Sequence, residues 1–146
     1  MAELSLDVGC GTRKMGDINV DIDRKVKPDI ICDIHHLPFK DNQFDKVYCY
    51  HVLEHETVNP ETAIKELLRV ANKTVEIQVP HWLSRNAKKD PTHRNFHIMH
   101  AKYWKKWKPI KIQIEWQYLI PPLILRPHNI TVTIKVNHYI RLQNGG

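Results

Sequence analysis

Two glycines and several acidic residues follow short apolar segments in the first third of the chain. The first segment and its turn read Leu-Ser-Leu-Asp-Val-Gly-Cys-Gly over Leu4–Gly11. Glycine allows a tight backbone turn and lets a ligand approach the main chain closely. Asp21 follows an alternating segment that begins at Ile18, and a carboxylate there can accept both hydroxyls of a ribose. Asp33 ends a third apolar segment. Together, the glycine turn and the acidic residues at the segment ends favour a nucleotide pocket at the carboxyl ends of parallel strands.

Three histidines follow segments of this kind and are our candidates for catalytic residues at an acceptor site. His51 follows the apolar segment 44–50, and His81 follows the segment 73–79. His93 lies in the polar, irregular segment 83–98, and a long functional loop of this kind often acts as a lid. Imidazole titrates near neutral pH, so each of these side chains could accept a proton from a substrate.

The segment His51-Val-Leu-Glu-His55 matches the His-x-x-Glu-His pattern of an inverted zinc peptidase. That pattern needs a long helix to present both histidines, and it needs a third ligand downstream. Here it follows a predicted strand directly, and Asn59-Pro60 interrupts the chain soon afterwards. We therefore expect no metal site, with Glu54 and His55 in structural roles.

Four motifs in this order resemble those of small class I S-adenosylmethionine-dependent methyltransferases. They are Leu-Asp-Val-Gly-Cys-Gly-Thr, Val-Asp-Ile-Asp, the stretch from Cys32 to Asp45, and His-Val-Leu-Glu-His. The resemblance covers residues 4–80. It implies a Rossmann-like α/β fold, S-adenosylmethionine as the cofactor and S-adenosylhomocysteine as the product.

The resemblance also implies cofactor-binding roles for particular residues, which are Asp7, Gly9, Gly11, Asp21, Asp33, Ile34 and His51. It places Asp33 at the adenine amino group, Ile34 beside the ring, and His51 beside the methionine end. For Asp33 the alternative is a turn-capping carboxylate. A nicotinamide cofactor is disfavoured because Lys14 stands where the third glycine of Gly-x-Gly-x-x-Gly would be.

Only about six residues separate Gly11 from Ile18, too few for a helix that crosses back over the sheet. We therefore expect a loop or a single turn there. Further along, Asn59 and Pro60 predict a helix start, and Asn72 suits a left-handed residue at its end. The remaining expected elements are a third strand at 28–34, a fifth at 73–79, a helix at 97–107, and antiparallel strands at 110–118 and 130–142. The predicted fold is a mostly parallel sheet with antiparallel terminal strands and a shortened first crossover.

The chain of 146 residues is long enough for one domain spanning 1–146, and its charge divides into two halves. Residues 1–83 carry 10 Lys and Arg against 14 Asp and Glu, whereas residues 84–146 carry 12 against 2. We expect the first half to bind the cofactor and the basic second half to face the substrate. A polyanion such as nucleic acid would suit that half, although its lysines could simply be solvated. A non-catalytic nucleic-acid-binding module on a degenerate methyltransferase fold is the alternative function.

The same second half contains Trp104 and Trp107 among lysines, a pattern that can bind nucleic acid but is more often one face of a core helix. The apolar connection 119–125 could cover the core, contact substrate or form a homodimer. We expect no membrane span and no secretory signal. Three cysteines without close spacing favour reduced thiols in a cytoplasmic protein.

Overall fold

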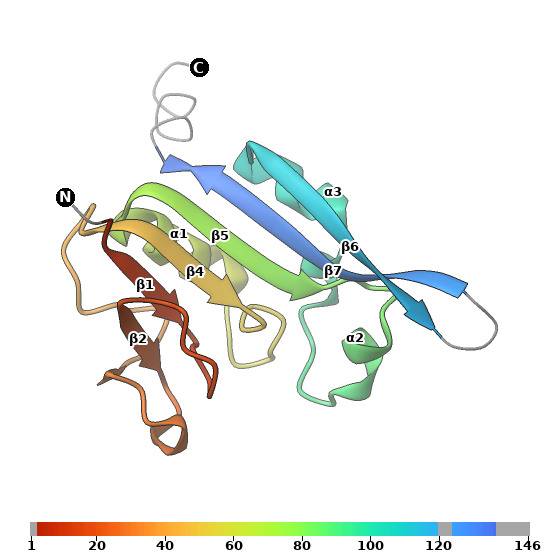
Figure 1. Cartoon of the computed structure of the whole chain (residues 1–146), viewed down its shortest axis with the longest axis horizontal. Coiled ribbons are helices and arrows are strands. Elements are labelled where there is room, and N and C mark those ends of the chain that lie inside the picture. Colours follow the sequence, from red (N-terminus) through yellow and green to blue (C-terminus); the bar gives the residue numbers. More distant parts are fainter. Residues whose placement is uncertain (1–2, 120–123, 137–146) are drawn as a thin grey trace.

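A seven-stranded mixed sheet forms the centre of the protein (Figure 1). The computed structural model describes residues 3–119 and 124–136. The strands are β1 Ser5–Val8, β2 Ile18–Asp21, β3 Ile30–Ile31, β4 Phe44–Tyr50, β5 Ala71–Pro80, β6 Lys111–Leu119 and β7 Ile124–Lys135. They lie in the order β3-β2-β1-β4-β5-β7-β6, with β7 antiparallel to both β5 and β6. The predicted fold class, a mostly parallel sheet with antiparallel terminal strands, is confirmed.

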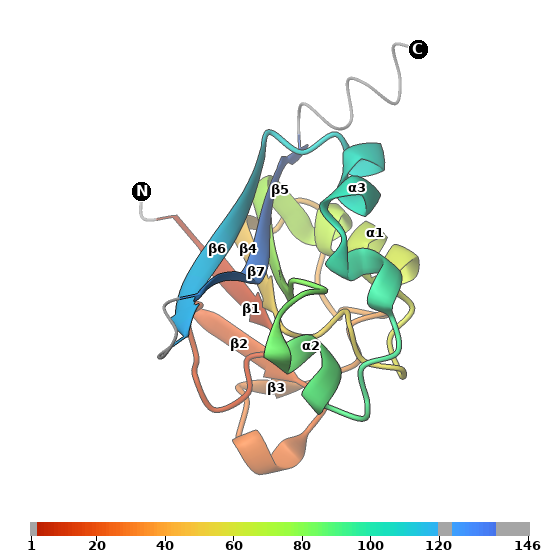
Figure 2. The same cartoon turned by 90° about the vertical axis from the view of Figure 1, so that its right-hand side faces the viewer.

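Helices cover one face of this sheet. The α-helices are α1 Pro60–Val70, α2 Arg85–Lys89 and α3 Ala101–Trp104, and the 3-10 turns are η1 Arg24–Val26, η2 Phe96–Met99 and η3 Lys105–Trp107. In Figure 2, α1 and α3 lie on the same side of the sheet, and the opposite face carries no helix within residues 3–119 and 124–136. Strand alternation explains the difference. Val75 and Ile77 of β5 are fully buried, while Glu76 between them and Gln78 after them are only half-buried.

The first crossover is short, as predicted. Residues 12–17 form no helix and run as a loop back to β2. The amide of Met15 donates to the Asp7 carboxylate at 3.0 Å, which fastens this loop to the adjacent strand. Gly16 packs so closely that a Cβ would lie 2.7 Å from the Asp7 amide nitrogen. The loop therefore closes on glycine, with no helix between β1 and β2.

Several of the expected local elements were wrong in extent or type, and the last strand begins at Ile124 and not at 130. The third strand is only Ile30–Ile31, because it pairs with β2 at just two positions before the chain turns. Ala71 is already extended at φ −84° and ψ 136°, so the chain enters β5 without a left-handed residue at Asn72. The expected helix 97–107 is broken at His100, whose extended backbone separates η2 from α3.

The two tryptophans of this region belong to the core. Trp104 is 0% exposed, Trp107 is 5% exposed, and the Trp104 indole donates to the Ile98 carbonyl at 2.7 Å. The core interpretation is therefore confirmed. Their rings are therefore not available for base stacking, whereas the surrounding lysines lie on the surface.

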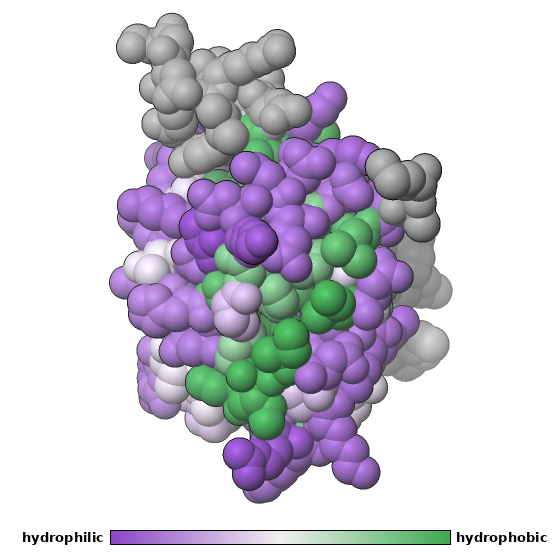
Figure 3. Space-filling model, turned by 90° about the vertical axis from the view of Figure 1, so that its left-hand side faces the viewer, coloured by the Kyte–Doolittle hydropathy of each residue, from purple (hydrophilic) through white to green (hydrophobic). Residues whose placement is uncertain are grey.

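The edge of the sheet around β3 is apolar and exposed. Figure 3 shows an apolar area on the side of the molecule where β2 and β3 lie. Ile22, Ile30 and Ile31 contribute there, with Ile22 70% exposed. No helix of the described residues covers this end, because the connections around β2 and β3 contain only the single turn η1.

Cys10, Cys32 and Cys49 are free thiols, as expected. No helix in the described part of the chain is both long and apolar enough to cross a membrane. The proposed dimer contact at 119–125 falls largely on residues 120–123, which lie outside the described residues.

Candidate functional site

Two cavities meet at the carboxyl ends of the parallel strands. The first cavity, about 350 Å³, lies between the ends of β1, β2 and β3 and the turn after β4. The second cavity, about 550 Å³, lies over the open face of the sheet between β1 and β7. Gly9 and His51 line both. The volume of the first cavity falls within the range of small-molecule sites in proteins.

The glycine turn after β1 brings main chain to this junction. Gly9 has a φ of +73°, and a Cβ there would lie 2.1 Å from the Val52 side chain. Gly11 has a φ of +53°, and a Cβ there would meet nothing within 4 Å. The backbone at Gly9 thus needs glycine for packing, whereas Gly11 leaves open space at the wall of the first cavity.

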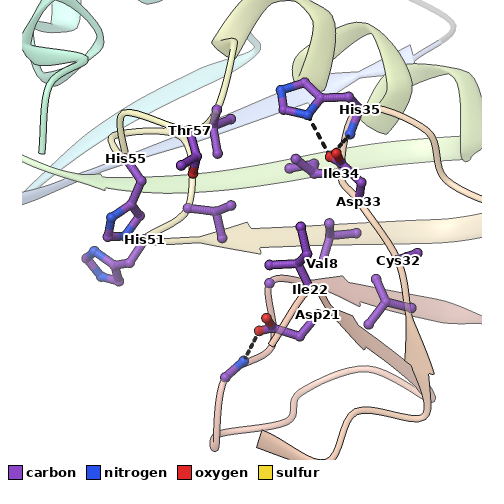
Figure 4. A pocket seen from close by; sticks show the side chains of 15 residues that line it. Val8, Asp21, Ile22, Cys32, Asp33, Ile34, His35, His51, His55 and Thr57 are labelled. Carbon is purple, nitrogen blue, oxygen red and sulfur yellow. Dashed lines mark hydrogen bonds and ion pairs between the residues drawn. The ribbon is translucent and has the colours of Figure 1, made fainter. Parts of the chain in front are cut away.

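Asp21 connects the glycine turn to the end of β2. Its Oδ2 accepts from the Gly11 amide at 2.9 Å (Figure 4), and its Oδ1 accepts from the Asp23 amide at 2.8 Å. Each carboxylate oxygen has a second lone pair, so the group can still accept two further hydrogen bonds. Asp23 is instead the cap of η1, where it accepts from the Lys25 amide.

Asp33 has the turn-capping contact that was its alternative role. Its Oδ1 accepts from the His35 amide at 2.9 Å and from the His35 ring at 2.6 Å. The amide hydrogen bond is the main reason that the pKa of Asp33 is lowered. His35 in turn accepts from the Asn59 amide at 2.8 Å, which ties this wall to the start of α1. Asp33 and the buried Ile34 both line the first cavity.

His51 is the side chain that both cavities share. It has a φ of +58° directly after β4, a strained conformation for a residue with a side chain. Its Nε2 lies 2.9 Å from Gln78 Oε1, and its Nδ1 lies 3.5 Å from Glu54. The interaction with Glu54 raises the pKa of His51 above its ordinary value. The other residue of the resemblance, Asp7, lines the second cavity and not the first.

Asp7 is buried beside the junction. It is 2% exposed, and burial raises its pKa while the hydrogen bond from Met15 acts in the opposite sense. Keeping a buried carboxylate here is unfavourable for folding, since desolvation penalises the charged form. The Met15 contact compensates only in part, so the carboxylate is a candidate for a polar contact with a ligand.

A polar network forms the far wall of the second cavity. Gln78 on β5 donates to Glu115 on β6 at 2.9 Å and to Thr131 on β7 at 3.0 Å. Asn129 donates to Glu115 at 3.1 Å. The sequence analysis missed these residues, because they converge only when β6 and β7 pair with β5. The alternating polar positions of β5, β6 and β7 were the available signal.

A third cavity adjoins the second and is rich in cations. It measures about 190 Å³ and is lined by Arg85, Lys89 and Arg126 together with uncharged and histidine side chains, without a carboxylate. His128 lines both this cavity and the second one. The cation-rich cavity is therefore next to the polar second cavity.

The other two candidate histidines do not line the first or the second cavity. His81 is buried, its Nδ1 accepts from the Leu83 amide, and burial lowers its pKa. His93 is also buried and contacts Glu54 and Asp90. Of the three, only His51 reaches the place where a cofactor and an acceptor could meet.

Comparison with known proteins agrees with this geometry. A family model described as a methyltransferase domain matches residues 18–75. An uncharacterized protein of Methanocaldococcus jannaschii is 43% identical over 81 residues, which is 46% of this chain and 35% of that protein. The match thus spans about a third of the length of that relative.

Solved structures share the fold at low sequence identity. A S-adenosylmethionine-dependent methyltransferase of Thermotoga maritima has a TM-score of 0.65 and 17% identity, covering 93% of this chain and 83% of its own. One from Methanosarcina mazei has a TM-score of 0.58 and 14% identity, covering 92% and 93%. The magnesium protoporphyrin IX methyltransferase of Synechocystis, with S-adenosylhomocysteine bound, has a TM-score of 0.55 and 15% identity, covering 92% and 74%.

The sheet order, the glycine turn and the matching family model agree with one another. The chain has the fold of class I S-adenosylmethionine-dependent methyltransferases, and a methyltransferase-domain model matches its residues 18–75.

Proposed function

We propose that this chain transfers a methyl group from S-adenosylmethionine to an acceptor that carries negative charge. The observation that carries the proposal is the junction at Gly9 and His51, two residues shared by the walls of a cavity suited to a nucleoside and of a larger polar cavity. A methyl donor in the first cavity could reach an acceptor in the second only through such a junction.

The residues of the first cavity fit the nucleoside part of the cofactor. Asp21 offers two carboxylate oxygens with free lone pairs to the ribose hydroxyls. The open space at Gly11 allows close approach to the main chain. Asp33 and Ile34 would flank the adenine, one as a hydrogen-bond acceptor and the other as an apolar wall.

The junction would hold the methionine end. The Asp7 carboxylate lines the second cavity beside Gly9 and would attract the amino group of the cofactor. When bound, the cofactor supplies a sulfonium methyl group, whose leaving group needs no acid because it is already positively charged. The remaining task of the chain is alignment, which alone can provide a large part of a rate enhancement. We assign His51 to contact with the acceptor, since its ring lies at this junction.

The third cavity supports an anionic acceptor. The reactive group would lie in the second cavity near His51, and its negatively charged part would bind Arg85, Lys89 and Arg126 next to it. Arginine forms charge-assisted, paired hydrogen bonds with phosphate and carboxylate. A polyanion such as nucleic acid has charges repeated along its length, which agrees with the positive net charge of residues 84–146.

We further propose one domain over residues 1–146, in which residues 1–83 bind the cofactor and residues 84–146 contact the acceptor. Free thiols at Cys10, Cys32 and Cys49 fit a reducing compartment, and we place the protein in the cytoplasm. The apolar segment 119–125 is the proposed contact of a homodimer.

The test is transfer of a labelled methyl group from S-adenosylmethionine to three acceptors: an oligoribonucleotide, a sulfated glycan and histamine. Histamine is included because the Thermotoga maritima structure is described as a possible histamine N-methyltransferase. Label in either polyanion supports the proposal. Label in histamine alone would contradict the anionic acceptor while keeping the reaction. Salt-sensitive binding of the oligoribonucleotide without transfer to any acceptor, and without binding of S-adenosylhomocysteine, would favour the non-catalytic nucleic-acid-binding module.

A further inference from the structure

Three potential metal ligands converge beside the first cavity from two segments far apart in the sequence. Glu54 and His55 lie in the turn after β4, and His93 lies in the loop after α2. One ligand atom from each lies within 4.8 Å of the other two. The two segments form an antiparallel bridge at His55 and His93. The side-chain amide of Asn95 donates to three carbonyl oxygens of the first segment, so the backbone is held in place.

The carboxylate of Glu54 has no hydrogen-bond donor. The side chain is 0% exposed, and both of its carboxylate oxygens lack a hydrogen-bond partner among the described residues. Two histidine nitrogen atoms lie close to Glu54 Oε1, His51 Nδ1 at 3.5 Å and His93 Nε2 at 3.9 Å. A buried carboxylate in this state is strongly unfavourable unless a cation compensates for it.

Hydrogen bonds fix the tautomer of each histidine in the cluster. His93 Nδ1 lies 3.3 Å from the Ala87 carbonyl and must donate to it, which leaves a lone pair on Nε2 of the neutral ring. Nε2 is the atom nearest to Glu54, so a lone pair and a carboxylate oxygen face each other.

His55 is held in the same way. Thr92 Oγ1 donates its hydrogen to Asp90 Oδ1 at 2.6 Å, so it accepts from His55 Nδ1 at 2.8 Å. His55 Nε2 then also has a free lone pair. Histidines that bind metals commonly donate their second ring nitrogen to a carbonyl or to a carboxylate-linked group.

We propose that Glu54, His55 and His93 bind a divalent transition-metal ion, zinc in the first instance. Two imidazole nitrogens and one carboxylate oxygen are a donor set that zinc prefers. Tetrahedral zinc with bonds near 2.1 Å places its ligands roughly 3.4 Å apart, close to the 3.9 Å between His93 and Glu54. Here the His-x-x-Glu-His pattern follows β4 and does not lie on the long helix of a peptidase. His93 supplies a third ligand, whose position beside Glu54 and His55 was not evident from the sequence.

The ion would fasten the loop around His93 to the wall of the first cavity, which His55 lines. It would therefore order the cofactor side of the site without taking part in methyl transfer. This inference does not depend on the proposed reaction, because it rests on Glu54 and the two histidines alone.

The experiment uses the full chain without a histidine tag, stripped with a chelator and titrated with Zn²⁺ and with Co²⁺. We expect about one equivalent of Zn²⁺ bound, a higher melting temperature on loading, and a visible absorption band of tetrahedral Co²⁺. His93→Gln and Glu54→Gln should weaken binding by at least about 100-fold. His55→Gln, at a half-buried position, provides a further variant should either buried one fail to fold.

His36→Gln is the matched control, because His36 is exposed and lies outside the cluster. It should bind both ions as the unmodified chain does. Two results would overturn the proposal: no stoichiometric ion and no thermal shift with the unmodified chain, or binding that the cluster variants and the control change equally.

Discussion

The first and second cavities share Gly9 and His51, yet they are built in different ways. Strand ends and the short turns that follow them supply the first cavity, within residues 8–58. The second cavity takes side chains from β1, β4, β5, β6 and β7, between residues 7 and 129. The first depends on local turns and main chain, while the second depends on strand pairing between distant segments. Cofactor binding and acceptor choice should therefore respond to different substitutions.

The largest expected effect is at Gly9, where both cavities depend on one backbone position. Gly9→Ala adds a Cβ that would lie 2.1 Å from Val52 and keeps a positive φ. Overpacking and strain together should lower the free energy of unfolding by roughly 3 kcal/mol. Chemical denaturation measures the free energy of unfolding of each variant. Gly11→Ala is the comparison, since it has open space and should lose only about 1 kcal/mol. Equal losses in both variants would contradict the role of Val52.

Removing the carboxylate of Asp21 should affect the first cavity alone. Asp21→Ala should weaken the binding of S-adenosylhomocysteine by about 1.5–3 kcal/mol, the contribution of a charged hydrogen-bonding group. Calorimetric titration measures the change. Asp23→Ala is the control, because Asp23 caps η1 and does not line the cavity. If the two variants bind equally, Asp21 does not contact the cofactor.

The cation-rich cavity should affect the acceptor and leave the cofactor unchanged. Arg85→Ala combined with Arg126→Ala should weaken binding of a labelled oligoribonucleotide by roughly tenfold or more and reduce its salt dependence. Fluorescence anisotropy at two salt concentrations measures both. Lys102→Ala, on α3 and outside this cavity, should change binding little. An equal effect of Lys102→Ala would indicate non-specific attraction by the whole basic half.

The smallest expected effect is a pH dependence of stability at His81. Burial lowers the pKa of His81, and His100 adds to this effect. The unfolded chain therefore binds the proton more readily, so stability should fall as the pH drops below about 6.5. His81→Gln should reduce the fall in melting temperature between pH 7.5 and 5.5 by about 3 °C or less. His36→Gln, at an exposed position, should leave the fall unchanged.

The difference between the two cavities also explains what the sequence could predict. The glycine turn, Asp21 and the short crossover were predictable because a few neighbouring residues determine them. Asp33 turned out to cap a turn through His35, a contact that depends on the position of α1. Glu115 and Asn129 could not be assigned, because their place follows from the register of β6 and β7. Likewise, nothing in the motif at Glu54 indicated that the loop after α2 would place His93 beside it.

The most direct test of the account is a structure of this chain with S-adenosylhomocysteine. We predict that the ribose contacts Asp21, the adenine lies against Ile34, and the sulfur lies at the junction of Gly9 and His51, facing the second cavity. A ligand with its sulfur turned away from His51, or bound in the second cavity alone, would contradict the proposed path of the methyl group.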